Sequence, residues 1–194
     1  IHDDNNIGEC IDECLQTAMR MAEEDPNVFV PQQFINPANP QVHRSHTGKE
    51  ILEQVDGPIH GFCSGIGTGG TITGIGETLK AANPDMEIWA VEPEHAAILS
   101  GGSIGSHLQM GIGDGVIPDI LNQNIYQDIY IVKDEEAIRT AQELASKEGI
   151  MCGISSGTNV AAAIQLAKKL GEDKTVVTVL PDTAERYFST PLFE

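Results

Sequence analysis

The chain has 194 residues, of which 40% are hydrophobic, and a formal net charge of −18 at pH 7. This length suffices for one ordinary domain with a sizeable core, and the composition is that of a globular protein rather than a fibrous or disordered one. The strong negative charge argues against nucleic acids and anionic membrane surfaces as partners.

The start of the chain, IHDDNNIGEC, has neither a basic nor an apolar run. We therefore expect no signal peptide, and a chain that is processed or belongs to a longer protein. Cys63 and Cys152 lie in apolar runs and are expected in the core. Cys10 and Cys14 share a helix face, but no further ligand follows at a spacing that would complete a metal site. We expect no metal and a reducing, cytoplasmic setting.

The first predicted element is a helix over residues 7–24, where apolar side chains recur every three or four positions. Residues 25–45 are polar and rich in Pro, Asn and Gln. Such a long polar stretch inside a compact domain is usually functional. A shorter helix is expected over residues 46–54.

Strands and helices alternate from residue 58 onward. The expected strands are 58–65, 87–93, 128–132 and 174–181, and the expected helices are 70–82, 133–149 and 155–171. Asp134 is expected to cap its helix, and the last strand to be covered on both faces. Residues 94–127 are expected to be irregular, and 150–154 short and extended. This order predicts an α/β fold, an open, mostly parallel twisted sheet with helices on both faces, as one domain over residues 1–194.

Glycines, hydroxyl-bearing residues and carboxylates gather where the predicted strands end. These ends carry Gly65–Thr71, Glu92–Pro93, Ser155–Ser156 and Pro181–Asp182. Ligands of open α/β sheets bind at the carboxyl ends of the strands. The sequence therefore predicts a binding site at this edge.

The segment GIGTGGTITGIG, residues 65–76, holds six glycines between a predicted strand and a predicted helix. It has three interpretations. It is a tight structural turn, a dinucleotide fingerprint with Glu92 on the ribose, or a cradle for one phosphate. The cradle would combine backbone amides with the hydroxyls of Thr68 and Thr71. The loop has no Lys or Arg, which excludes a Walker-type site.

Four motifs decide among these, since together they resemble one family. They are PQQFINPANPQVHRSHTGKEI, GTGGTITG, GISSGTNVAAA and LPDTAERYFSTPLFE. Residues 32–194 resemble cysteine synthase (O-acetylserine sulfhydrylase), a fold type II enzyme that depends on pyridoxal 5′-phosphate and is related in fold to the tryptophan synthase β subunit. The resemblance implies that the chain is the larger, cofactor-binding domain, and that the small N-terminal domain is absent from it.

The resemblance also implies roles for particular residues. Those expected to hold the cofactor's phosphate are Gly67, Thr68, Gly69, Gly70 and Thr71. Ser155 is expected to hydrogen-bond the pyridine nitrogen, which leaves that nitrogen largely neutral and favours β-elimination over transamination. Gln33 is expected to contact the substrate carboxylate, and the backbone of Gly111 and Gly113 to line the substrate cleft.

Other polar residues are expected in lesser roles. Asp182 is assigned a supporting role near the ring. His43, His46 and His107 are expected at the surface or in structural roles, because the family transfers protons with a lysine. The segment GSHLQMGIGDG, residues 105–115, departs from the family pattern, and Asp114 places a charge near the cleft.

The implied reaction is the replacement of the acetoxy group of O-acetyl-L-serine by sulfide, giving L-cysteine and acetate. None of the seven lysines has the sequence context of the family's Schiff-base lysine, so the chain alone is expected to be inactive. A homodimer is expected, with serine acetyltransferase as a further partner. Three alternatives stay open: an enzyme like cystathionine β-synthase or O-phosphoserine sulfhydrylase, a lysine-free module that binds an anion or a partner without catalysis, and a dinucleotide-binding oxidoreductase domain.

Overall fold

The computed structural model describes the backbone of residues 7–194 and the side chains of Ile11 and residues 13–194. Its sheet has four strands in the order β3-β2-β1-β4, and all neighbours pair in parallel. The strands are β1 (Gly61–Gly65), β2 (Glu87–Pro93), β3 (Asp128–Val132) and β4 (Val176–Thr178). The parallel α/β fold predicted from the alternation is confirmed.

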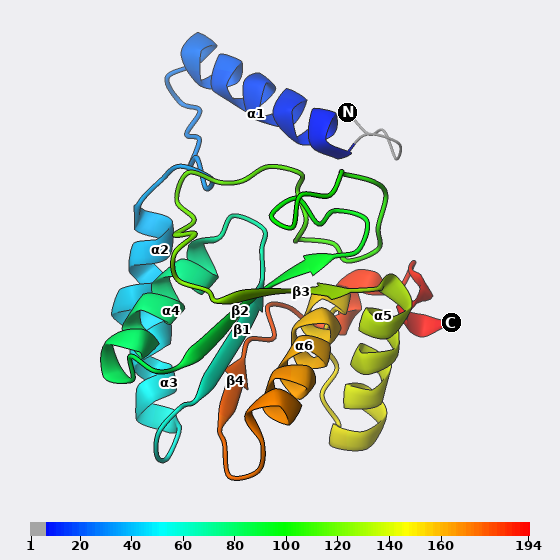
Figure 1. Ribbon diagram of the computed structural model, residues 1–194. Helices are drawn as coiled ribbons and strands as arrows, with labels where there is room; N and C mark the ends of the chain where they lie inside the picture. Colours follow the sequence, from blue (N-terminus) through cyan, green and yellow to red (C-terminus); the bar gives the residue numbers. More distant parts are fainter. Residues whose placement is uncertain (1–6) are drawn as a thin grey trace.

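Helices cover both faces of this sheet (Figure 1). In chain order they are α1 (Ile7–Glu24), α2 (Ala38–Val42), the π-helical turn η1 (His43–Thr47), α3 (Gly48–Gln54), α4 (Gly70–Ala82), α5 (Asp134–Glu143), the π-helical turn η2 (Leu144–Glu148), α6 (Ile154–Leu170) and the 3-10 turns η3 (Ala184–Tyr187) and η4 (Pro191–Phe193). The group α2, α3 and α4 lies on one side of the sheet, and α5 and α6 lie on the other, while α1 stands apart beyond the top of the sheet in this view.

Successive residues of β1 and β2 feed two separate cores, because side chains alternate between the faces of a strand. Phe62 and Ile88 are fully buried in the core under α4. Cys63 and Trp89 point the other way, into the core beneath α5 and α6. Both central strands are therefore buried along almost their whole length, as expected for strands covered on both faces. The predicted core positions of Cys63 and Cys152 are confirmed, with 0% and 3% exposure.

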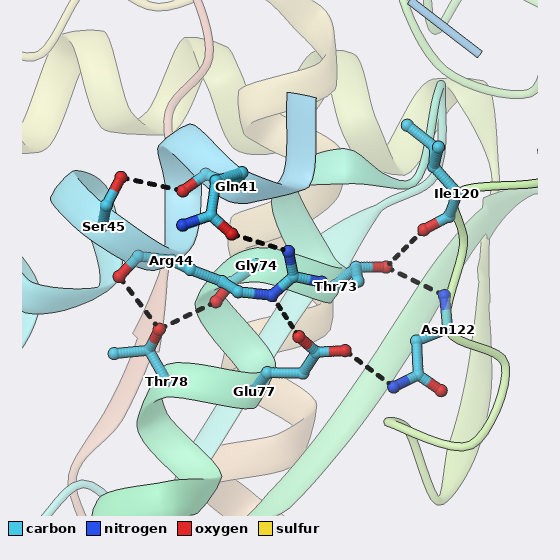
Figure 2. A network of polar contacts seen from close by, with 9 residues as sticks. All are labelled: Gln41, Arg44, Ser45, Thr73, Gly74, Glu77, Thr78, Ile120 and Asn122. Carbon is cyan, nitrogen blue, oxygen red and sulfur yellow. Dashed lines mark hydrogen bonds and ion pairs between the residues drawn. The ribbon is translucent and has the colours of Figure 1, made fainter. Parts of the chain in front are cut away.

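A polar network fastens α4 from the outside (Figure 2). The Arg44 guanidinium on η1 forms an ion pair with Glu77 on α4. The Asn122 amide donates to the second oxygen of Glu77 at 2.8 Å, and the Asn122 backbone N–H donates to Thr73 Oγ1 at 3.0 Å. The Thr78 hydroxyl donates to the Arg44 carbonyl at 3.2 Å. The network therefore holds α4, whose first turn borders the site described below, between η1 and the loop after residue 117.

The predicted helix over 46–54 starts earlier, because α2, η1 and α3 run on without a break from Ala38. The Asn36 side chain accepts the Ala38 N–H at 2.9 Å. Pro37 is the N-cap of α2 and Pro40 falls in its first turn, where a missing N–H costs nothing. The polar stretch 25–45 is thus helical in its last third.

The last predicted strand, 174–181, is wrong in length and in burial. Only β4 pairs, and it lies at the edge of the sheet with half-buried side chains. Residues 179–181 leave the sheet. The predicted cap at Asp134 is also wrong: Lys133 is the N-cap of α5, and the Asp134 carboxylate accepts hydrogen bonds from the segment before β3 instead.

The helix predicted over residues 7–24 is confirmed as α1, although the Cys10 side chain lies outside the described residues. Within the described part of the chain, three or more His, Cys, Asp or Glu side chains nowhere gather as metal ligands would. In the same part, every helix is too short or too polar to cross a membrane.

Candidate functional site

A cavity of about 970 Å³ opens where β1 ends and the chain leaves β4. Its lining comes from one side of α1 and from Gln33, Phe34, His43, Thr47, Ser64, Gly65, Gly67, Thr68, Gly69, Thr71, Gly111, Ile112, Asp114, Asn159 and Val179 to Pro181. This size suits a small-molecule ligand. The site therefore lies at the carboxyl edge of the sheet, where the sequence predicted it.

Residues 67–71, here called the glycine loop, form the floor of this cavity. Gly69 is the N-cap of α4 and has φ of +77°, a conformation that favours glycine. A Cβ added there would lie 2.8 Å from Cβ of Leu121, so both backbone and packing require glycine. Among the described residues, none accepts a hydrogen bond from the amides of Gly67, Thr68, Gly69 or Thr71. The loop thus presents free N–H groups at the positive end of a 13-residue helix, an arrangement that binds anions.

Two side chains from the polar segment brace the glycine loop. The Asn39 amide donates to Thr68 Oγ1 at 3.0 Å and to the Gln33 carbonyl at 2.8 Å. Nε2 of His43 lies 3.4 Å from Thr71 Oγ1, and burial lowers the pKa of His43. His43 therefore borders the cavity, and its expected surface or structural role stays a prediction. The sequence around His43 does not signal this position, because the packing of η1 on α4 brings the His43 side chain to the cavity.

The predicted site residues fall into two groups. Gly67, Thr68, Gly69, Thr71, Gln33 and Gly111 line the cavity. Gly70 is buried behind the loop, and its N–H donates to Thr68 Oγ1 at 3.3 Å. Gly113 is buried beneath the segment from Gly111, and Ser155 lies buried in the first turn of α6. Gly70, Gly113 and Ser155 are outside the set that lines the cavity.

Unpaired polar atoms lie in the first turn of α6 and in the segment after β4. Ser156 Oγ and Asp182 Oδ1 are buried without a hydrogen-bond partner among the described residues. The other oxygen of Asp182 accepts from the Tyr187 hydroxyl, and burial, followed by this contact, raises the pKa of Tyr187. The Gly153 N–H donates to the Asp182 carbonyl at 3.2 Å, which ties the end of the β4 segment to the start of α6.

Asn159 is a lining residue that the sequence reasoning missed. Its Oδ1 accepts the Gly65 N–H at 2.7 Å, and its Nδ2 donates to the Val179 carbonyl at 2.8 Å. Asn159 therefore joins α6 to the end of β1 and to the segment that follows β4. Its place in the motif GISSGTNVAAA was the available signal, as the polar segment was for Asn39.

Glu92 does not face the glycine loop, as a ribose-binding carboxylate would. It is 4% exposed, and its oxygens accept from the Leu99 N–H at 2.7 Å and from the Ser100 hydroxyl at 2.9 Å. Both oxygens serve the loop after β2. The geometry thus disfavours the dinucleotide interpretation.

Lysine is missing from the cavity lining. All seven lysines lie within the described residues, and each lies elsewhere. Lys169, for example, pairs with Glu87 at the opposite end of the strands. A parallel sheet with free amides and hydroxyls at its carboxyl edge has the features of a site that binds a small anion.

Comparison with known proteins identifies the family. Residues 4–182 match the family described as pyridoxal-phosphate dependent enzyme, and the chain belongs to that family, whose members use pyridoxal phosphate. A cysteine synthase of Staphylococcus aureus (strain Mu50 / ATCC 700699) is 49% identical over 185 residues, which cover 93% of this chain and 60% of that protein. The chain thus spans about three fifths of the length of this relative.

Two solved structures agree with this assignment. Cysteine synthase from Entamoeba histolytica superposes with a TM-score of 0.87 at 39% identity, over 92% of this chain and 53% of the other. The O-acetylserine dependent cystathionine β-synthase from Helicobacter pylori superposes with a TM-score of 0.88 at 34% identity, over 93% of this chain and 58% of the other. The resemblance predicted from the four motifs is confirmed.

The residues present fit pyridoxal 5′-phosphate. A phosphate ester would satisfy the free amides of the glycine loop, whose Thr68 and Thr71 add hydroxyls. The cofactor's ring carries a nitrogen that accepts a hydrogen bond, and the start of α6 offers the buried hydroxyls of Ser155 and Ser156.

Proposed function

We propose that this chain forms the cofactor-binding part of a cysteine synthase, which replaces the acetoxy group of O-acetyl-L-serine by sulfide. The observation that carries the proposal is the row of free amides in the glycine loop, open to a cavity in a chain 49% identical to a cysteine synthase. Bound pyridoxal 5′-phosphate would supply an electron sink that makes the α-proton acidic and lets the β-substituent leave.

Several residues at and behind the cavity have roles in this proposal. The glycine loop holds the phosphate with amides and with the hydroxyls of Thr68 and Thr71, and Asn39 keeps the Thr68 hydroxyl in place. Ser155 donates a hydrogen bond to the ring nitrogen. Gln33, which extends from the segment above the loop, contacts the substrate carboxylate together with the backbone at Gly111.

The Schiff base requires a lysine amine at the cavity, and the seven lysines of this chain lie elsewhere. The lysine must also move the α-proton, and no other group of the lining can take both roles. We therefore propose that the 194 residues alone bind the cofactor but do not make cysteine.

Borohydride reduction followed by peptide mapping tests this. We expect no single lysine of the 194-residue chain to carry the cofactor stoichiometrically, and no sulfhydrylase turnover. A stoichiometric adduct on one of the seven lysines, with turnover, would overturn the proposed division of roles.

A second candidate reaction is favoured by the likeness to the Helicobacter pylori enzyme. In it, a larger thiol replaces sulfide as the nucleophile at the same site.

The assembly expected is a homodimer, with serine acetyltransferase as a further partner. Exposed aromatic side chains such as Phe29, Phe188 and Phe193 suit self-association. Sedimentation equilibrium should therefore show association, and a strict monomer would count against it.

A further inference from the structure

Asp114 is the carboxylate-bearing residue of the cavity lining within the described part of the chain. Its Oδ2 would lie 3.6 Å from a Cβ added to Gly67, so the carboxyl group stands beside the glycine loop. Gly111, proposed to line the substrate cleft, belongs to the same segment. Asp114 lines the same cavity as Gln33 and Gly111, the proposed substrate contacts. The roles proposed above leave it without a function.

The segment that carries Asp114 is held firmly. Gln109 is fully buried, and its Nε2 donates to the Val132 carbonyl at 2.9 Å and to Asp134 at 2.8 Å, while its Oε1 accepts from Thr158 at 2.8 Å. These bonds anchor the segment to β3, α5 and α6. On its other side, the Gly113 N–H donates to the Ile66 carbonyl at 2.8 Å. Asp114 is thus presented to the cavity from a fixed backbone.

Two features of its surroundings act on the pKa of Asp114. Burial raises its pKa, and the nearby His107 opposes this. His107 is the charged or titratable group that acts on the Asp114 carboxyl. Nε2 of His107 lies 3.3 Å from the carbonyl oxygen of Gly113. A carboxyl group with a raised pKa holds its proton more strongly than a free one, and a carboxyl group beside a substrate can give a proton to a leaving group and take one from a nucleophile.

We infer that Asp114 is the acid–base group for the substituent at the substrate's β-carbon, and that it extends the substrate class to amino acids with a β-hydroxyl, such as L-serine. This inference rests on the proposed function. Acetate leaves readily without a proton, whereas hydroxide does not, so a carboxylic acid matters most for the hydroxyl.

The proton balance closes over one turnover. The electron pair of the Cα–H bond forms a second bond between Cα and Cβ as the Cβ–O bond breaks with its own pair on oxygen, and the Asp114 proton joins that oxygen to release water. The α-proton, moved by the lysine, returns to Cα at the end of the turnover. When the thiol or sulfide nucleophile then forms the Cβ–S bond, its S–H proton returns to the Asp114 carboxylate. L-Serine and a thiol thus give a thioether and water, and Asp114 ends as it began.

The test uses the protein expressed from its complete coding sequence and reconstituted with pyridoxal 5′-phosphate. Turnover with sulfide is measured for L-serine and for O-acetyl-L-serine. We expect both to be substrates, and Asp114→Asn to lower the ratio of L-serine to O-acetyl-L-serine turnover by about 100-fold, the usual scale of general acid catalysis. The matched control Asp119→Asn, which removes an exposed carboxylate, should leave the ratio unchanged.

The outcomes separate the two proposals. Turnover of O-acetyl-L-serine but not of L-serine, or an unchanged ratio in Asp114→Asn, would overturn the inference and leave the proposed function standing. Turnover of neither substrate would overturn both.

A readout without cofactor is carboxyl ¹³C NMR of the 194-residue chain. One aspartate should titrate above the others, and its signal should vanish in Asp114→Asn but not in Asp119→Asn. No such signal would also overturn the inference.

Discussion

The side-chain amide of Asn39 donates a hydrogen bond of 3.0 Å to the hydroxyl of Thr68, 29 residues further along the chain. The same amide holds the Gln33 carbonyl at 2.8 Å, so one residue joins the segment of the proposed substrate contact to the proposed phosphate site. This link explains why the polar stretch before α2 is ordered next to the cavity.

Asn39→Ala should weaken anion binding at the glycine loop by roughly fivefold, the value of about one net hydrogen bond. The reason is that the Thr68 hydroxyl would lose the donor that orients it. Sulfate titration followed by thermal unfolding measures this, because a ligand of the folded state raises Tm. Asn124→Ala, at an exposed position, is the matched control. Equal sulfate responses in both variants would contradict the prediction.

Gly69→Ala and Gly101→Ala separate two costs of placing a side chain on a backbone with positive φ. Both glycines have φ near +80°, but a Cβ at Gly101 meets open space, whereas one at Gly69 meets Leu121 at 2.8 Å. We expect Gly101→Ala to lower the free energy of unfolding by about 1 kcal/mol and Gly69→Ala by about 3 kcal/mol. Urea denaturation measures both, and equal losses would show that the contact with Leu121 relaxes freely.

Anion binding should depend on pH through His43. Burial lowers its pKa from 6.5, so the imidazole is neutral in the free protein at pH 7. An anion bound beside Thr71 should raise that pKa, so binding takes up a proton and strengthens as pH falls. Sulfate, which stays a dianion, should bind roughly three- to fivefold more tightly at pH 6 than at pH 8, since a rise of one pKa unit gives a factor of ten only well below both pKa values. His43→Gln should remove most of this dependence, and an unchanged profile in the variant would exclude His43.

The ion pair between Arg44 and Glu77 should matter most above acid pH. Burial acts to raise the pKa of Glu77, but the hydrogen bonds from Arg44 and Asn122 outweigh it and leave the pKa below 4.5. The contribution is present above that value and is lost as pH falls through the folded-state pKa. Glu77→Gln should therefore cost about 1 kcal/mol of unfolding free energy at pH 7 and less at pH 3. A loss that is equal at both pH values would contradict this.

Hydrophobic periodicity and turn residues predicted the helices and strands whose bounds depend on neighbouring residues alone. The helix from Gly70 to Ala82 and the strands 87–93 and 128–132 have the predicted bounds. The helical run from Ala38 was hidden by prolines that its first turn accommodates. β4 is shorter than its apolar run because residues 179–181 line the cavity instead of pairing.

The candidate site likewise contains parts that the local sequence reveals and parts that depend on contacts between distant segments. The glycine loop was visible from its composition, since few other structures need so much free backbone. The positions of His43 and Asn159 at the cavity depend on contacts between segments distant in sequence, such as the 2.7 Å bond from the Gly65 N–H to Asn159 Oδ1. Asp134 was assigned to its own helix because a propensity cannot reveal a partner 26 residues away.

The most direct measurement is a binding titration of the 194-residue chain with pyridoxal 5′-phosphate and with pyridoxal, which lacks the phosphate. If the glycine loop holds the cofactor by its phosphate, pyridoxal should bind at least about 100-fold more weakly, because several hydrogen bonds to a charged group are lost. Sulfate should compete with pyridoxal 5′-phosphate, and NAD should not. Equal affinity for the two compounds, or displacement by NAD but not by sulfate, would contradict a cofactor site built on this loop.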